Sequence, residues 1–183
     1  RPSINWSDVS SSYFGVRMSP KGFAFDGRGA SMFCDDKIRL YLLGLLASKI
    51  TSFTLNVLNP TLTFNINNVE AIPVILSNKE YVDSIVEQCV CIAQTDWDSF
   101  ETSWDFTRHP LVRGAATVAE AFAAWEAECE GRFQQLKANE EELNRIFIDI
   151  YGLQDELTPE VKDKDVTVRR ANLGRDVRSL LSY

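Results

Sequence analysis

Few residues of this sequence have the type and spacing that catalysis requires. His109 is the only histidine, and no serine lies in the glycine-flanked turn that presents a catalytic hydroxyl. His109 precedes Pro110 in a predicted loop, where we interpret it as a surface or capping histidine rather than a catalytic base. Carboxylate pairs are frequent after residue 77, but charge runs are typical of solvent-exposed helix faces. These patterns predict a chain without a complete active site.

The four cysteines form no familiar metal or disulfide motif. Cys34, Cys89, Cys91 and Cys129 fit neither a disulfide framework nor the spacing of zinc ligands. Cys89 and Cys91 lie two residues apart on a predicted helix, so their side chains point to different faces. We expect reduced thiols and no metal site.

Two short motifs are incomplete versions of nucleotide-handling sites. Enzymes that methylate base amino groups hold the flipped base with an Asn/Asp-Pro-Pro-aromatic motif, but Asn59-Pro60-Thr61 lacks the second proline and the aromatic residue. Gly27-Arg28-Gly29 lacks the rest of a glycine-rich phosphate-binding fingerprint. We therefore interpret Asn59-Pro60 as a helix stop and expect no cofactor in this chain.

A binding surface is the remaining candidate site. Asparagine can pair bidentately with adenine, and Lys and Arg bind backbone phosphates. Arg28 is flanked by glycines, so it could approach a groove of DNA closely. Composition alone favours the plainer alternative, that these are ordinary exposed residues. The candidate DNA-contacting residues are Arg17, Lys21, Arg28, Lys37, Arg39, Asn65 and Asn67.

Charge is distributed unevenly along the 183 residues. The net charge of -7 argues against a uniformly basic nucleic-acid binder. Residues 1–75 carry seven Lys/Arg and five Asp/Glu, whereas the remainder carries twelve and twenty-one, so a polyanion would prefer the first part. No apolar run suits a membrane span or a signal peptide, which predicts a cytoplasmic protein without membrane contact. The first residue is not Met, and we expect a part of a longer protein.

The first third of the chain combines turns, short strands and one apolar helix. Residues 11–18, 23–25 and 30–33 are predicted strands, separated by tight turns at 19–22 and 26–29. A helix follows from Asp36, apolar on more than one face and therefore buried, with Lys37, Arg39 and Lys49 reaching out. Residues 61–67 alternate polar and apolar types, which predicts a strand with Asn65 and Asn67 on its polar face. Residues 72–75 contain Pro73 and suit an edge strand or extended segment.

The remainder reads as helical. Capping-box patterns at residues 77–80 and 117–120 predict two helix starts. Residues 118–150 have helical spacing, as one helix or as two with a break near 138, and Gly152 is the expected C-cap. Residues 158–160 resemble another helix start, and 171–181 a last amphipathic helix. We expect the acidic, aromatic residues 96–106 to fold back on the core.

These elements predict an α+β fold. A small β-rich module with a buried helix precedes a mostly α-helical region with long amphipathic helices. The expected domains are a recognition-like module at 1–76, a helix with an acidic aromatic connector at 77–115, and a helical spacer at 116–183.

Several short motifs occur in a characteristic order along the chain. They are MSPKGFAFD at 18–26, Met32-Phe33, LLGLLASK at 42–49, LNPTL at 58–62 and IPV at 72–74. In this order they resemble the target-recognition domains of restriction-modification specificity subunits and fused methyltransferases. Two longer segments, DWDSFETSWDFTRH at 96–109 and NEEELNRIFIDIYGLQDELTPEV at 139–161, give a closer match. They resemble the C-terminal region of large adenine-specific DNA methyltransferases of BREX-type phage-defence systems.

The resemblance implies a parent enzyme that transfers a methyl group from S-adenosylmethionine to N6 of adenine in double-stranded DNA. Its catalytic domain would lie upstream of Arg1, and the present chain would supply sequence recognition and a spacer. The family's catalytic motifs do not occur here, so no catalytic residue is carried over. The alternative is a protein-interaction module that docks other subunits of the defence complex or a dimer partner, through the acidic, aromatic helices after Ser77.

Overall fold

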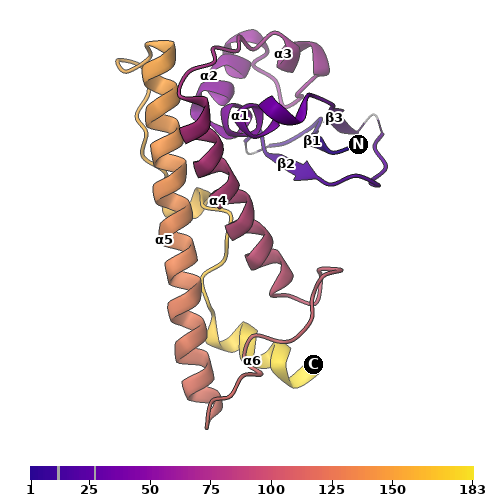
Figure 1. Ribbon diagram of the computed structural model, residues 1–183, viewed down its shortest axis with the longest axis vertical. Helices are drawn as coiled ribbons and strands as arrows, with labels where there is room; N and C mark the ends of the chain where they lie inside the picture. The colour runs from indigo at the N-terminus through magenta and orange to yellow at the C-terminus, as the bar shows by residue number, and fades with distance from the viewer. Residues whose placement is uncertain (12, 27) are drawn as a thin grey trace. The chain divides into compact units, whose positions relative to one another are not determined.

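The computed structural model describes residues 1–11, 13–26 and 28–183, and it confirms an α+β fold. The contacts divide the chain into two compact units (Figure 1). We call Arg1–Glu87 with Glu140–Glu160 the sheet unit, and Gln88–Asn139 with Val161–Tyr183 the helical unit. The ranges 1–76, 77–115 and 116–183 expected from the sequence are functional divisions and stay a prediction.

The sheet unit contains a three-stranded antiparallel sheet in the order β2-β1-β3. The strands are β1 (Ser3–Ser7), β2 (Val16–Ser19) and β3 (Gly29–Met32). The prediction for 30–33 matches β3 within one residue at each end, and β2 is the end of the strand expected at 11–18, of which Ser12 lies outside the described residues. Gly27, in the expected turn at 26–29, lies outside them too.

The sequence analysis missed one strand of this sheet and wrongly predicted another nearby. The central strand β1 was not predicted, although Ile4 and Trp6 alternate with polar residues and are both buried. Residues 23–25 form no strand, and Phe23 and Phe25 are 67% and 63% exposed. The backbone of residues 23–25 pairs with none of the three strands.

One face of the sheet is covered by aromatic and helical packing. The Trp6 ring lies 5.9 Å from that of Phe14, which lies 5.0 Å from Phe64. The Trp6 Nε1 group also donates to the Phe64 carbonyl at 3.0 Å. Helix α1 (Asp36–Ala47) contacts β2 and buries Tyr41 and Leu45 completely. The predicted buried helix is therefore present.

The apolar helix bends after Ala47. Helix α2 (Lys49–Leu58) follows after Ser48, at 68° to α1. The hydroxyl groups of Ser48 and Thr51 both donate to the Leu45 carbonyl, at 2.6 and 2.7 Å, which satisfies that oxygen where the helix breaks. Helix α2 ends before Asn59, as the Asn-Pro pair predicts.

The strand predicted at residues 61–67 is wrong. Asn65 is instead the N-cap residue of the short helix α3 (Ile66–Glu70). Leu62 and Ile66 are 59% and 51% exposed, so their alternation does not mark a buried face. The hydroxyls of Thr61 and Thr63 bond each other at 2.8 Å, which favours a local turn after Pro60 over a long ladder.

Two long helices run from one unit into the other. They are α4 (Lys79–Asp98) and α5 (Val118–Tyr151), the latter a single helix of 34 residues without the possible break near 138. The Thr117 hydroxyl accepts from Glu120 N at 3.2 Å, which confirms the predicted helix start. Gly152 has φ +66°, and Leu153 N donates to the Ile148 carbonyl, which confirms the predicted C-cap.

The chain after Gly152 is mostly extended. The helix start predicted at residues 158–160 is wrong, because Lys49 Nζ holds the carbonyls of Thr158 and Glu160 at 2.8 and 2.6 Å. A short 3-10 turn, η1 (Asp163–Asp165), and helix α6 (Leu173–Ser182) follow. Helix α6 is the last amphipathic helix that the sequence predicts.

The connector between α4 and α5 only partly folds back on the core. Phe100 packs near Trp125, with ring centroids 6.4 Å apart, whereas Trp97 and Trp104 are 52% and 100% exposed. His109 is buried rather than at the surface, and its Nδ1 accepts from Leu111 N at 3.2 Å, which is the expected capping role.

Within residues 1–11, 13–26 and 28–183, no single helix is both long and apolar enough to cross a membrane. Only the bent pair α1 and α2 reaches that length and composition together.

Candidate nucleic-acid interface

A row of polar side chains crosses the sheet on the face opposite its aromatic core. Asn5 in the central strand pairs with Arg17 on β2 and with Ser31 on β3. Residues directly opposite in antiparallel strands project to the same face, and this face is not that of Ile4 and Trp6 because the side-chain period is two. Arg17, Asn5 and Ser31 therefore lie side by side.

Hydrogen bonds fix the Asn5 amide within this row. The Ser3 hydroxyl donates to Asn5 Oδ1 at 2.9 Å, and Asn5 Nδ2 donates to the Ser31 hydroxyl at 2.6 Å. Each of the two amide atoms can make a further hydrogen bond. One acceptor position on Oδ1 and one N–H donor on Nδ2 therefore remain for a ligand. An asparagine uses this combination of acceptor and donor to read the edge of adenine.

Arg28 lies at the start of β3 and is held by two carboxylates. Asp26 Oδ1 accepts from the backbone N–H groups of Arg28 and Gly29 at 2.9 and 2.8 Å. These two bonds lower the pKa of the Asp26 carboxyl, so it stays charged. The Arg28 guanidinium pairs with Asp8 at 2.8 Å but is 83% exposed, and it is therefore available to a ligand.

Two other predicted cations are exposed without forming one compact group. Lys21 lies in the turn after β2 beside Gly22, which has φ +103°. Lys37 lies in the first turn of α1, where its backbone N–H donates to the Asp35 side chain at 2.9 Å. Their ammonium groups suit flexible, sequence-independent contacts to phosphate.

The expectation that Arg39 and Lys49 reach into solvent was wrong. Arg39 is 7% exposed, pairs with Asp36, and donates to the Cys34 carbonyl at 3.1 Å. Its guanidinium bonds to the segment between β3 and α1, and it could contact DNA only if these bonds broke. Lys49 is half-buried because it holds the segment at residues 158–160.

Asn65 and Asn67 do not lie on a strand face. Asn65 precedes α3 and Asn67 is its second residue, and both side chains are exposed. Neither belongs to the row on the sheet, since α3 follows the turn at Pro60. They stay candidates only as exposed amides.

Sequence reasoning missed Asn5 and Ser31. The alternating pattern SINWS is the signal that could have identified β1 and its polar face. The pattern covers only five residues, so it was too short to be decisive by itself.

The expectation that this chain holds no cofactor stays a prediction. Dinucleotide cofactors bind at a glycine-rich connection from a strand to a helix, and residues 33–35, between β3 and α1, contain no glycine. No group of three or more His, Cys, Asp or Glu side chains that could hold a metal occurs among the described residues.

Comparison with known proteins finds two relatives that are much longer than this chain. Over its whole length the chain is 47% identical, across 190 aligned residues, to the adenine-specific methyltransferase PglX of Lacticaseibacillus casei (strain Zhang). Over 84% of its length it is 32% identical to the adenine-specific methyltransferase BrxX of Escherichia coli O9:H4 (strain HS). The chain spans only 16% and 13% of these two proteins. No family model matches, and the two relatives confirm the resemblance inferred from the sequence.

Proposed function

We propose that this chain, homologous to one region of the BREX-type adenine-specific methyltransferases, is the DNA sequence-recognition region of such an enzyme. The observation that carries the proposal is the row Arg17, Asn5 and Ser31 on the outer face of the sheet. Asparagine reads an adenine edge, and arginine reads guanine or binds phosphate, so this row supplies both kinds of contact.

The parent enzyme would bind double-stranded DNA in the bacterial cytoplasm and transfer a methyl group from S-adenosylmethionine to N6 of adenine. The flipped base and the cofactor would be held by other parts of the enzyme, since neither the Asn/Asp-Pro-Pro-aromatic motif nor a complete glycine-rich fingerprint occurs in this sequence. Arg17, Lys21, Arg28 and Lys37 would contribute to register on the duplex, and Asn5 to the choice of sequence.

The Asn5 side chain provides a direct test. We expect Asn5→Ala in the full-length protein to lower the preference for the methylated site over a changed site by about 5- to 100-fold, the effect of one bidentate contact. The readout is sequencing of methylated adenines on a library of duplexes. Asn56→Ala is the matched control, because Asn56 is an exposed asparagine on α2, away from the sheet.

A region exchange tests the proposal as a whole. Replacing this chain by the corresponding region of a relative with another target should move methylation to the relative's sequence. An unchanged set of methylated sites, with methylation rate retained, would exclude a recognition role. A change of rate alone, at unchanged sites, would assign the region to assembly rather than to specificity.

The exposed tryptophans favour a second candidate, a protein-interaction role. Trp104 is fully exposed and Trp97 half-exposed, and large exposed apolar side chains often mark a docking surface. Trp104→Ser should then weaken binding to another subunit of the defence system, or shift the mass measured by light scattering. If neither changes while methylation sites follow the region exchange, recognition alone accounts for this chain.

A further inference from the structure

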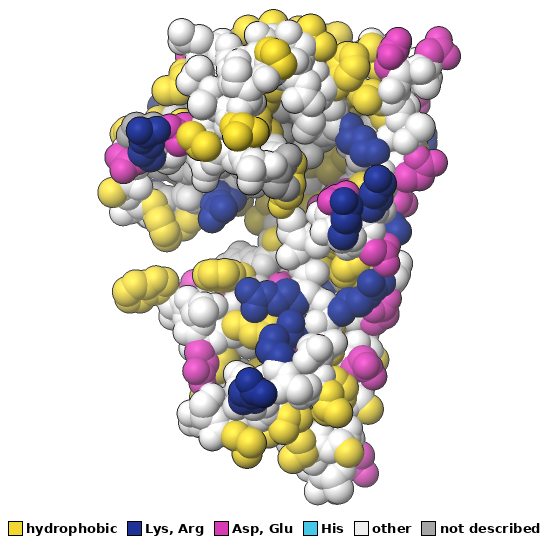
Figure 2. Space-filling model, turned by 180° about the vertical axis from the view of Figure 1, so that it is seen from behind, with side chains coloured by type: hydrophobic (Ala, Val, Ile, Leu, Met, Phe, Trp, Pro, Cys, Tyr) yellow, Lys and Arg dark blue, Asp and Glu magenta, His cyan; other side chains and the backbone are white. Residues whose placement is uncertain are grey.

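The helical unit carries a face rich in exposed arginines. The four arginines from 169 to 178 lie on the extended segment before α6 and on α6 itself. Arg169, Arg170 and Arg178 are exposed, and the Arg175 side chain is 37% exposed. Figure 2 shows Lys and Arg side chains close together in the lower half of the view, with few Asp or Glu between them. We call these four residues the arginine face.

Two acidic groups at this face, Asp96 and Asp176, are buried, whereas Glu130 and Asp163, which pair with Arg170, are partly exposed. Asp96 and Asp176 are 7% and 3% exposed. Asp176 accepts from Trp125 Nε1 at 3.0 Å, from Arg175 Nε at 2.5 Å and from Asn172 N at 2.9 Å. Burial alone would raise the pKa of Asp176, but these bonds lower it, so its charge is held inside. The Asp176 carboxylate therefore faces inward, whereas Arg169, Arg170 and Arg178 are exposed.

Aromatic rings hold two of the guanidiniums in place. Arg169 lies 4.6 Å from the Phe100 ring, and Arg170 lies 3.7 Å from the Phe133 ring. Arg170 also pairs with Glu130 and Asp163 at 2.8 and 3.0 Å. A stacked guanidinium loses little entropy on binding a ligand, although the Arg170 nitrogens already donate to Glu130 and Asp163.

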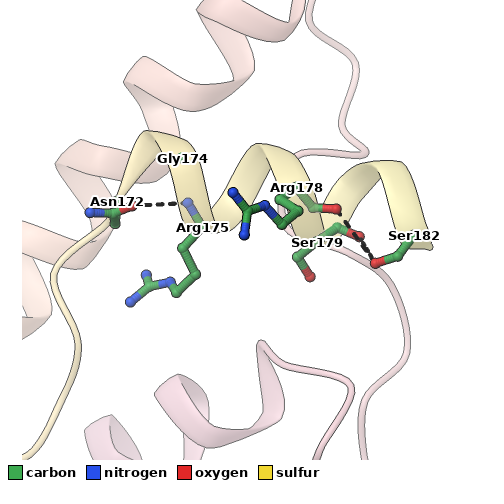
Figure 3. A pocket seen from close by; sticks show the side chains of 6 residues that line it. All are labelled: Asn172, Gly174, Arg175, Arg178, Ser179 and Ser182. Carbon is green, nitrogen blue, oxygen red and sulfur yellow. Dashed lines mark hydrogen bonds between the residues drawn. The ribbon is translucent and has the colours of Figure 1, made fainter.

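Arg178 is the arginine whose charge is least engaged. Within the described part of the chain no ion pair involves Arg178, in contrast to Arg170 and Arg175. It lines a hollow of about 570 Å³ along α6 with Asn172, Gly174, Arg175, Ser179 and Ser182 (Figure 3). These positions recur at helical spacing, so guanidinium and hydroxyl groups share one stripe of α6.

The backbone N–H groups in the first turn of α6 do not by themselves make an anion-binding site. Asn172 Oδ1 already accepts from Arg175 N at 2.9 Å, and Asp176 adds its charge to that end of the helix. The guanidiniums, rather than the free N–H groups of a helix end, give this surface its affinity for anions.

We propose that the arginine face binds backbone phosphates of duplex DNA without regard to sequence, as a second contact separate from the sheet. This proposal rests on the proposed function only in that the parent enzyme acts on DNA. Fixed arginines with neighbouring hydroxyl and amide groups are the usual donors to phosphate oxygens, and such contacts set register without reading bases.

Charge reversal of Arg178 tests the proposal in the full-length protein. Each phosphate contact contributes a slope of about -0.9 to the dependence of log affinity on log salt. We expect Arg178→Glu to reduce that slope by about one for a random-sequence duplex of roughly 30 base pairs. When the salt concentration rises fourfold, the affinity of the variant should therefore fall about threefold less than the affinity of the wild type. The set of methylated sequences should not change, and Arg178→Lys should restore the slope.

Arg145→Glu is the matched control, because Arg145 is an exposed arginine of α5 in the sheet unit, paired with Glu142. A salt slope unchanged by Arg178→Glu, in a variant that melts at the wild-type temperature, would overturn the proposal and leave the face to an acidic protein partner. The region exchange is read from methylated sequences and this test from salt dependence, so failure of one is distinguishable from failure of the other.

Discussion

Individual residues were predictable where their role is local. Lys37 and Arg28 are exposed as expected, because a long charged side chain in a turn or a first helical turn meets solvent. Arg39 is only two residues beyond Lys37, yet it is buried by a backbone carbonyl at Cys34 and by Asp36. Its position on the inner side of α1 depends on how α1 packs on the sheet, which no local pattern contains.

Glu140 shows a second consequence of packing at the scale of one residue. It lies half-buried on α5, and Leu143 and Asn144, three and four residues later, are buried on the same side. Burial, reinforced by the neighbouring Glu141 charge, raises the pKa of the Glu140 carboxyl to about 7. The folded protein therefore binds this proton more tightly than an unfolded chain does.

The sign of the pH effect follows from that difference. The contribution of Glu140 to stability is fully present below the unfolded pKa of about 4.3 and is lost as pH rises through about 7. We expect Glu140→Gln to raise the free energy of unfolding by about 1–3 kcal/mol at pH 8 and by little at pH 4. Urea denaturation at both pH values measures this, with the exposed Glu126→Gln as control. An equal effect at both pH values would contradict it.

At the scale of elements, helices were predictable and short strands were not. Helix α5 has periodic apolar positions and local capping at both ends, so its existence follows from the sequence. The alternation of polar and apolar residues at 61–67 is typical of a strand, but within this segment only Thr63 forms a β-bridge, to Val9. A strand needs a partner far along the chain, whereas a helix satisfies its own backbone.

The close approach of α1 and α4 depends on one glycine. A Cβ atom at Gly44 would lie 2.6 Å from Val86 Cγ2 of α4, and Val86 is only 2% exposed. We expect Gly44→Ala to lower the free energy of unfolding by about 1–3 kcal/mol, because overpacking outweighs the better helix propensity of alanine.

Gly131 of α5 is the matched control for that substitution. A Cβ atom there meets nothing within 4 Å, so Gly131→Ala should raise the free energy of unfolding by about 0.5–1 kcal/mol. Urea denaturation of both variants compares two helical glycines in different packing. Stabilisation by both substitutions would contradict the tight contact at Gly44.

Over the whole molecule, the net charge does not show where positive side chains gather. The helical unit carries ten Lys/Arg and eleven Asp/Glu, yet Asp96 and Asp176 are buried under its arginine face. Residues 140–160 alone carry seven Asp/Glu and one Arg, which accounts for most of the acidic excess. The difference in charge between residues 1–75 and the remainder therefore did not reveal the arginine face.

Sequence choice and phosphate binding should then be separable, since they belong to different units and share no hydrogen-bond partner among the described residues. We expect Asn5→Ala to lower the discrimination between duplexes, and Arg178→Glu to lower the salt slope, each without the other effect. In the double variant the free-energy changes should add to within about 0.5 kcal/mol. Affinity measured on a methylated-site duplex and a random duplex, at two salt concentrations, gives both quantities. A larger deviation from additivity would contradict this expectation. It would mean that Asn5 and Arg178 contribute to one shared set of DNA contacts, because independent contacts give additive changes in free energy.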